Sequence, residues 1–339
     1  MRIAFVAQPD LVNVNYRAYV PMMELGHHGH DVGFNRPGED RFPLERLAAA
    51  DVVHVHRFID DEALAAARAL RDAGVAVVFD NDDDLTCIPR SNPWHARFGG
   101  VRRGGVAQRL AAMARAAHVV TTPSAVLAER FRAMGAADVR VVENFLPNAF
   151  PGTGPLEHDG VRVVWLAGLE HQLDYERLRL RDVLEQLLDA HAQLRVLSIG
   201  LGLGLDPDRY EHVPSVEFPS LARALARADI GIAPLADIPW NQARSNVKLK
   251  EYGAAGLAWL ASPVGAYRAL GERHGGRLVA DDAWADALDR LITRRRERRK
   301  LAKRAARWAR GETIRRNVGR WLAVYEAAIA AARAGRARS

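Results

Sequence analysis

Residues 241–265 read Asn-Gln-Ala-Arg-Ser-Asn-Val-Lys-Leu-Lys-Glu-Tyr-Gly-Ala-Ala-Gly-Leu-Ala-Trp-Leu-Ala-Ser-Pro-Val-Gly. The stretch opens as a polar loop, in which Ser245 or Asn246 can cap a helix because a short side-chain oxygen accepts from the free first-turn amides. The helix is predicted to end at Gly256, and an apolar strand at 257–261 follows before Ser-Pro. A helix leading into a short buried strand is typical of α/β proteins.

Lys248 and Glu251 share one face of this helix, near its N-terminus. The helix end and Lys248 suit an anion, and Glu251 can accept hydrogen bonds from sugar hydroxyls. The pair therefore predicts a site for a ligand with both phosphate and hydroxyl groups, and we expect both side chains on an exposed helix face. The alternative is an amphipathic helix with a solvated Lys–Glu pair.

The composition indicates a globular protein of about two domains, with 339 residues, 49% hydrophobic and 26% charged. The one cysteine, Cys87, excludes an internal disulfide and fits a reducing compartment. The N-terminal apolar run is too short for a signal peptide, and no run approaches the roughly 18 apolar residues of a membrane span. We therefore expect a cytoplasmic protein.

The net charge of +7 is unevenly distributed. Residues 294–339 contain 16 arginines and lysines and three glutamates, a net charge of +13, which leaves −6 for the rest of the chain. A basic terminal segment can bind nucleic acid or anionic lipid. Because the rest of the chain offers no basic surface to extend such a footprint, we expect no nucleic-acid partner. We expect at most weak peripheral contact with the inner face of an anionic membrane.

Short apolar segments alternate with helical segments in both halves of the chain, which predicts βα units and parallel sheets. Residues 143–160 are rich in Pro, Gly and Asn and are interpreted as a linker, and the long irregular piece at 81–103 indicates a function. The expected strands are 2–7, 30–34, 51–56, 75–79, 119–120, 139–142, 161–167, 194–199, 230–234, 257–261 and 277–279. The expected helices are 16–25, 60–73, 104–116, 124–134, 175–190, 221–228, one from 283 and one after 311.

The last helix has an apolar stripe at spacings of three and four, which predicts one buried face. The stripe needs an apolar partner, and the first half of the chain is a reasonable one. The stripe consists of Ile314, Val318, Trp321, Leu322, Tyr325 and Ile329.

The pattern S-N-x-K-x-K-E-Y-x-A-x-G, followed by an apolar strand and S-P-V-G, resembles the donor-binding helix of GT-B glycosyltransferases in the large family-4 group, also called glycosyl transferases group 1. In that group a glutamate at the position of Glu251 holds the ribose of a nucleotide-sugar. The resemblance implies an α/β GT-B architecture with two Rossmann-like doubly wound domains, 1–150 and 151–310, facing across a cleft. It also implies that a C-terminal helix, 311–335, crosses back to the first domain.

Two motifs of the first half, at 16–17 and at 80–84, also resemble motifs found in a subset of GT-B enzymes. Tyr16 and Arg17 match a Y-R variant of the loop that opens the first helix, and Arg17 there suits an anionic group. In the third strand His56 and Arg57 stand at the carboxyl end, where a cleft role is expected, whereas His54 is interpreted as core. His-x-His is a poor metal site here because no third ligand stands nearby.

The acidic run Asp80-Asn-Asp-Asp-Asp84 follows the fourth strand and resembles V-x-x-D-x-D-D-D-L in that subset. The alternative, a Mg²⁺ site as in single-domain GT-A enzymes, conflicts with the two-domain pattern. Like charges this close need partners, so we expect the run to face Arg17 or Arg57, or polar groups of an acceptor.

Gly168-Leu-Glu-His171 follows the first strand of the second half and resembles G-S-x-x-H-x-x-D-L in the same subset. The family's motif has two glutamates eight positions apart, and Ala243 stands where the first belongs. Asp237 or Asn241 are the candidates to substitute for it.

These features predict a glycosyltransferase that moves a sugar from a nucleotide-diphosphate sugar to a glycan, lipid-linked or small-molecule acceptor. The resemblance implies retention of configuration. We expect turnover without a divalent metal, because the acidic run is assigned to the acceptor side of the cleft, and we expect no cofactor. The alternative is a GT-B-like protein that binds a sugar nucleotide without catalysis. The expected catalytic residues are His56, Asp82 and Lys248; the donor-binding residues are Gly168, His171, Arg244, Ser245, Asn246, Lys248 and Glu251; the acceptor-binding residues are Tyr16, Arg17, Arg57, Asp80 and Asp83.

Overall fold

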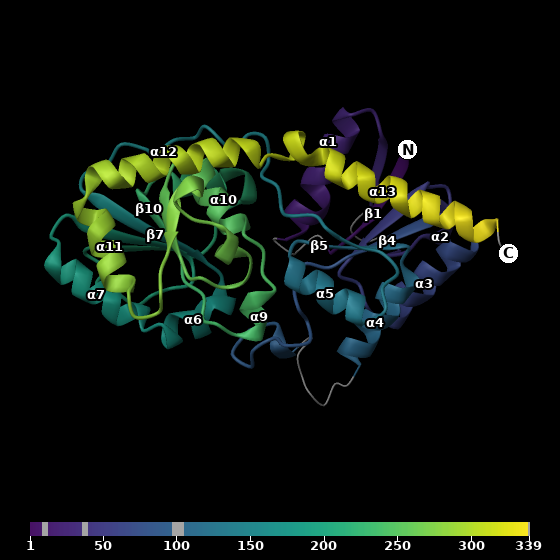
Figure 1. The fold of residues 1–339 in the computed structure, drawn as a ribbon, viewed down its shortest axis with the longest axis horizontal. Coiled ribbons are helices and arrows are strands. Elements are labelled where there is room, and N and C mark those ends of the chain that lie inside the picture. The colour runs from purple at the N-terminus through teal and green to yellow at the C-terminus, as the bar shows by residue number, and fades with distance from the viewer. Residues whose placement is uncertain (9–12, 36–39, 97–104, 338–339) are drawn as a thin grey trace. The chain divides into compact units, whose positions relative to one another are not determined.

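The computed structural model describes residues 1–8, 13–35, 40–96 and 105–337, and it divides into two compact units (Figure 1). Unit 1 is drawn from Met1–Cys87, Phe98–Phe145 and Ile314–Ser339, and unit 2 from Ile88–Arg97 and Leu146–Thr313. The boundary between Phe145 and Leu146 therefore lies inside the predicted linker, five residues before the predicted end of the first domain at 150. A short piece of the predicted irregular segment belongs to unit 2.

Unit 1 contains a parallel six-stranded sheet in the order β2-β1-β3-β4-β5-β6. Every residue of β3 and β4 is buried, as expected for central parallel strands whose two faces are both covered. The strands are β1 Arg2–Val6, β2 Asp31–Phe34, β3 Val52–His56, β4 Ala76–Asp80, β5 Val119–Thr122 and β6 Val139–Val141.

Most helices of unit 1 follow the predicted alternation, but the short helix α2, Leu44–Leu47, was not predicted. The predicted first helix begins as a π-helical turn, η1, and α5 is capped as expected because Ser124 Oγ accepts from the Leu127 amide at 3.3 Å. The helices are η1 Asn15–Tyr19, α1 Val20–His27, α2 Leu44–Leu47, α3 Asp61–Asp72, α4 Val106–Ala116, α5 Ala125–Ala133 and α13 Ile314–Arg336.

The C-terminal helix α13 completes the core of unit 1 (Figure 1). Four residues of its predicted apolar stripe are buried, whereas Leu322 and Ile329 are only partly buried. Trp321 and Tyr325 are fully buried in the same cluster as Phe5 of β1 and Val78 of β4. Unit 1 therefore combines segments from the two ends of the sequence in one hydrophobic core.

Unit 2 contains a second parallel six-stranded sheet, in the order β12-β11-β10-β7-β8-β9. Counted along the unit, this is the 3-2-1-4-5-6 order of dinucleotide-binding Rossmann folds read from its other edge. The strands are β7 Val161–Ala167, β8 Leu194–Gly200, β9 Tyr210–Val213, β10 Ile230–Ala233, β11 Ala258–Ala261 and β12 Gly276–Leu278. The helices are η3 Leu169–His171, α6 Gln172–Arg177, α7 Leu180–Ala190, η4 Phe218–Ser220, α8 Leu221–Leu225, α9 Pro239–Gln242, α10 Val247–Ala254, η5 Gly265–Ala269, η6 Glu272–His274, α11 Trp284–Thr293 and α12 Arg295–Gly311.

Three elements of unit 2 differ from the prediction. The single helix expected at 175–190 is two helices, α6 and α7, because Arg179 adopts a left-handed conformation (φ 48°) between them. Strand β9 and the 17-residue helix α12 were not predicted. None of the helices in the described part of the chain is long and apolar enough to cross a membrane.

Candidate functional site

The sheet of unit 2 changes direction of winding between β7 and β10, and open α/β sheets bind ligands at the carboxyl ends of such strands. The loop after β7 forms η3 and α6, and the loop after β10 leads through α9 to α10. The predicted donor-binding residues come from these two loops and from α10. The sheet topology therefore gives the predicted donor residues a common location within one unit.

Asp174 of α6 joins the two loops. Its Oδ1 accepts hydrogen bonds from the Ala236 amide at 2.9 Å and from Asn241 Nδ2 at 2.7 Å, and its Oδ2 accepts from His171 Nδ1 at 2.7 Å. The side chain is buried, and each bond is strengthened by the charge of the carboxylate. Asp174 thus fixes both the loop after β10 and the ring of His171.

The contacts of His171 define its tautomer and its partner. Nδ1 donates to Asp174, which leaves Nε2 as the acceptor for Lys248 Nζ at 2.9 Å. Burial, followed by the charge of Lys248, lowers the pKa of His171 to about 4, so the ring is neutral at pH 7. Burial and the neighbouring Arg244 lower the pKa of Lys248 to about 8. Asp174, His171 and Lys248 therefore form a chain that orients a cation with an unusually low pKa.

Glu170 places a carboxylate beside these cationic groups. Its Oε1 lies 3.4 Å from the Arg244 guanidinium and 3.7 Å from His171 Nε2. Burial raises the pKa of Glu170, but the charges of Arg244 and Lys248 and a backbone hydrogen bond outweigh burial and hold this pKa below its usual range. Gly168 precedes this turn, and a Cβ there would lie 2.1 Å from Glu170 Oε2.

Helix α10 packs more deeply than its sequence indicates. Glu251 is only 4% exposed, so the expectation of an exposed face is wrong for this residue. Asn246 is the N-cap residue, but its side chain makes no capping hydrogen bond. The Tyr252 ring lies against Gly231, where a Cβ would be 2.4 Å from it, and this close approach draws the helix onto β10.

The position of the absent first glutamate is occupied by a core residue. Ala243 is completely buried, and Asn241, one candidate to substitute for the glutamate, is buried and bonded to Asp174. Asp237, the other candidate, is exposed and paired with Arg268 at 3.3 Å. Asn241 therefore supports the loop, and Ser245 and Arg244 remain at the partly buried start of α10.

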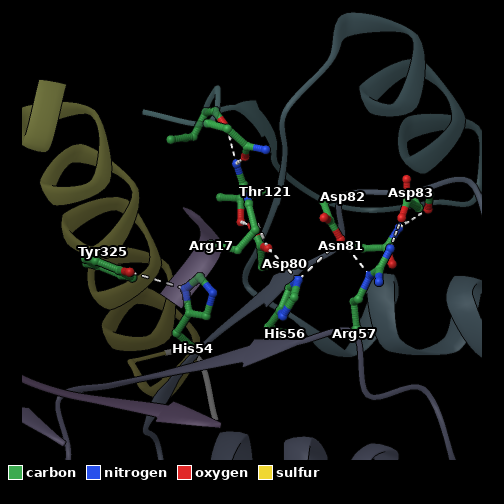
Figure 2. A network of polar contacts seen from close by, with 12 residues as sticks. Arg17, His54, His56, Arg57, Asp80, Asn81, Asp82, Asp83, Thr121 and Tyr325 are labelled. Carbon is green, nitrogen blue, oxygen red and sulfur yellow. Dashed lines mark hydrogen bonds and ion pairs between the residues drawn. The ribbon is translucent and has the colours of Figure 1, made fainter. Parts of the chain in front are cut away.

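In unit 1 the ion pair between Arg17 and Asp80 is the centre of a buried network (Figure 2). The Arg17 guanidinium donates to both oxygens of Asp80, to the Val142 carbonyl at 2.5 Å and to Asn144 Oδ1 at 2.9 Å. Thr121 Oγ1 donates to Asp80 at 2.5 Å. Arg17 and Asp80 are both 0% exposed, which differs from the predicted direct contact with an acceptor.

His56, Arg57, Asp82 and Asp83 continue this network toward the end of β3, as Figure 2 shows. Arg57 Nε lies 2.6 Å from Asp82 Oδ1, and its guanidinium also pairs with Asp83. His56 Nε2 lies 3.3 Å from Asp82 Oδ1, and His56 Nδ1 has no hydrogen-bond partner within the described part of the chain. Burial raises the pKa of Asp82, but Arg57 and His56 lower it more strongly, to well below its usual range. The expectation that the acidic run faces Arg17 and Arg57 is confirmed.

Arg57 holds a backbone conformation that is rare for its residue type, with φ 63°. Left-handed conformations cost roughly 1–2 kcal/mol for residues with a Cβ. The Arg57 amide donates to the Asp80 carbonyl at 2.9 Å, so the strained turn is tied to β4. This geometry directs the guanidinium toward Asp82 and Asp83.

The remaining predicted residues of unit 1 are internal. Tyr16 is 3% exposed. His54 is fully buried beside Trp321, with Nδ1 3.2 Å from Tyr325 Oη, which confirms its interpretation as core. Asp84 is 2% exposed and pairs with Arg130.

The predicted site residues thus fall into two groups. The donor-binding group and Lys248 belong to unit 2, whereas His56, Asp82 and the acceptor-binding group belong to unit 1. Glu170 and Asp174 were absent from the predicted set. The sequence could have identified Asp174, because the G-S-x-x-H-x-x-D-L pattern includes this aspartate. Glu170 occupies a position at which the pattern allows any residue.

Similar solved structures cover nearly the whole chain. Anabaena HepE in complex with UDP and glucose has a TM-score of 0.66 and 14% identity, over 95% of this chain and 98% of that chain. Sucrose-phosphate synthase from Thermosynechococcus elongatus has a TM-score of 0.67 and 14% identity, over 98% and 100%. An alpha-glucosyltransferase in complex with UDP and a 13-mer DNA containing an HMU base has a TM-score of 0.67 and 14% identity, over 96% and 99%.

No family model matches the sequence, and no curated protein matches it at a significant level. The structural similarity therefore concerns the fold, and the predicted fold class is confirmed: two units, each a parallel six-stranded sheet with helices, give this chain the GT-B fold.

Proposed function

We propose that the protein is a glycosyltransferase of the family-4 type that transfers a sugar from a nucleotide-diphosphate sugar to an acceptor. The observation that carries the proposal is the pair Lys248 and Arg244 at the winding change of a Rossmann sheet, with Lys248 oriented by His171 and Asp174. A solved structure with the same fold contains UDP-glucose, which supports a uridine diphosphate sugar as the first donor to test.

The proposed division of labour within unit 2 follows the chemistry of its side chains. Lys248, Arg244 and the start of α10 bind the diphosphate, whose negative charge grows as the glycosidic bond breaks. Preorganised cations there stabilise the departing diphosphate. Glu251 accepts from the ribose hydroxyls, and the Gly168 and His171 turn approaches the diphosphate without a large side chain at 168.

For the acceptor we propose the network of unit 1. Asp82 and Arg57 hold the ring of His56, but His56 is completely buried, which differs from its predicted catalytic contact with the acceptor. The partly exposed Arg57 and Asp83 are therefore the groups that we assign to the acceptor hydroxyl. Arg17 and Asp80 support that network from the interior, and Tyr16 and Asp83 complete it. The acceptor itself stays open among glycan, lipid-linked and small-molecule hydroxyls.

Metal independence is part of the proposal. Asp80 pairs with Arg17, and Asp82 and Asp83 share Arg57, so each of the three carboxylates already has an arginine partner. We expect full turnover in the presence of excess chelator. Loss of turnover that Mg²⁺ or Mn²⁺ restores would refute this assignment of the acidic run.

We also propose that the reaction retains the anomeric configuration of the sugar, which the resemblance of residues 241–265 supports. The NMR signal of the anomeric proton of the product measures this configuration.

The test of the donor site is a calorimetric titration of UDP and UDP-sugars into the wild type, Glu251→Gln and Glu185→Gln. A charge-assisted hydrogen bond is worth roughly 1.5–3 kcal/mol, so Glu251→Gln should weaken UDP binding about tenfold or more. Glu185 lies on the exposed side of α7, paired with Arg181, and its variant should bind as the wild type does.

Equal affinity for UDP in all three proteins would show that Glu251 does not contact the nucleotide. UDP-sugar binding with neither transfer nor slow hydrolysis would favour the binding protein without catalysis.

A further inference from the structure

The phosphate side of the proposed donor site already contains an anion, the carboxylate of Glu170. Arg244 lies 3.4 Å from Glu170 Oε1, and His171 Nε2 lies 3.7 Å from the same oxygen. Lys248 reaches the same corner through its hydrogen bond to His171 Nε2. The groups that we assign to a diphosphate therefore face an internal carboxylate in this structure.

The carboxylate is held close over the backbone of its own turn. Gly168 has no side chain, and the space that a Cβ would fill there lies 2.1 Å from Glu170 Oε2. Glu170 stays ionised at physiological pH because the charges of Arg244 and Lys248 hold its pKa below its usual range. A permanent negative charge therefore lies where an anionic ligand of this site would bring its own.

The local structure allows this side chain to leave. Glu170 belongs to η3, a single turn of three residues, and its side chain is 26% exposed. The preceding residue, Leu169, is 60% exposed. In contrast, Asp174 and His171 are each almost fully buried and bonded to the loops on both sides. Rotation of Glu170 toward solvent leaves those contacts in place.

We propose that Glu170 is an internal competitor for the diphosphate, a proposal that rests on the donor site assigned above. The carboxylate balances Arg244 and Lys248 while the site is empty. It leaves when a diphosphate binds, because two anions cannot share the same cations without repulsion. It returns as the nucleoside diphosphate departs, so the cations are never left unbalanced.

Two consequences follow for ligand choice. A diphosphate brings more negative charge than a monophosphate and displaces the carboxylate more readily, so Glu170 favours ligands with two phosphates. The same competition weakens the binding of the free nucleoside diphosphate and thereby speeds its release after transfer. Glu170 thus sets the specificity of the phosphate site without being a catalytic residue.

The experiment is a calorimetric titration of UDP, UMP and inorganic pyrophosphate into the wild type, Glu170→Gln and the control Glu176→Gln. Glu176 is exposed on α6 and bonded to Gln172, away from the cations. We expect Glu170→Gln to bind UDP and pyrophosphate about tenfold more tightly than the wild type. We also expect its preference for UDP over UMP to shrink. Glu176→Gln should match the wild type, and thermal unfolding checks that each variant is folded.

Unchanged or weaker binding of pyrophosphate by Glu170→Gln overturns the proposal and makes Glu170 a ligand contact or a support of its turn. Pyrophosphate separates this failure from a failure of the proposed function. Tighter pyrophosphate binding by Glu170→Gln, with no added affinity for UDP, supports the competitor and refutes the nucleotide assignment. If neither protein binds any of the three anions, both proposals fail. A misfolded Glu170→Gln is replaced by Glu170→Ser, which also removes the charge and carries the same expectations.

Discussion

At the scale of single residues, the ionisation of Lys248 controls the charge that meets the donor. Burial, followed by Arg244, lowers the pKa of Lys248 to about 8. The cation that we assign to the diphosphate is therefore lost as the pH rises through 8. We expect the affinity for UDP to be highest near pH 7 and to fall by up to tenfold per pH unit above 8.

This prediction is measured by titrating UDP calorimetrically between pH 7 and 9.5. Lys248→Arg is the matched variant, because an arginine keeps its charge throughout this range and should give a nearly flat profile. A wild type whose affinity does not change with pH would show that Lys248 does not contact the anion.

Part of the candidate site could be predicted from residue types and spacing. Lys248 and Glu251 were found because a helix of this pattern places them together, and His171 because it follows a strand of the expected kind. Asp174 contacts Asn241, and Glu170 contacts Arg244. In each pair the two residues are about 70 positions apart in the sequence. Local periodicity carries no information about such contacts.

At the scale of elements, the pair Arg17 and Asp80 ties η1 to β4 and to the chain after β6. Removing one partner of a buried ion pair leaves an uncompensated charge and costs roughly 3–5 kcal/mol. We expect Arg17→Ala to lower the free energy of unfolding by about that amount. Chemical denaturation monitored by circular dichroism measures the change.

Arg2→Ala is the matched control for that measurement. Arg2 also pairs with an aspartate, Asp31, at 2.9 Å, but both side chains are more than half exposed, and such pairs contribute about 1 kcal/mol or less. Equal losses in the two variants would contradict the assignment of Arg17 to the interior network.

Most strands could be predicted because central parallel strands are continuous apolar runs, as in β3 and β4. Helix α12 was missed because nine of its 17 residues are arginine or lysine, and its buried residues are one leucine, one arginine and two alanines. Helix α12 packs instead by close approach of its backbone to α10. A Cβ on Gly253 of α10 would lie 2.7 Å from the carbonyl oxygen of Ala305 in α12. The buried Lys250 also pairs with Glu312 at 2.7 Å. Small residues in contact give little hydrophobic signal in a sequence.

At the scale of the whole molecule, buried neutral histidines make both units sensitive to acid. Burial lowers the pKa of His54 in unit 1 to about 3 and that of His171 in unit 2 to about 4. Both values lie below the unfolded value of about 6.5, so the stability that neutral histidines contribute is fully present above pH 6.5. It is lost as the pH falls from 6.5 toward the folded values.

We therefore expect each of these histidines to cost roughly 2 kcal/mol of stability between pH 7 and pH 5. Urea unfolding at several pH values measures the slope. His54→Phe keeps an aromatic ring beside Trp321 but cannot take up a proton, so its unfolding should depend less steeply on pH. The same slope in this variant would exclude His54 as a source of acid sensitivity.

The division of unit 1 between two distant parts of the chain has a consequence for synthesis on the ribosome. Domains usually fold in the order in which they are made. Here the core around Phe5 and Val78 lacks the face of α13 until residues 314–336 have been translated, whereas unit 2 is complete once Thr313 has emerged. The part of the protein that is made first therefore reaches its native state last, and a released chain truncated before Ile314 should contain a folded second unit and an unfinished first one.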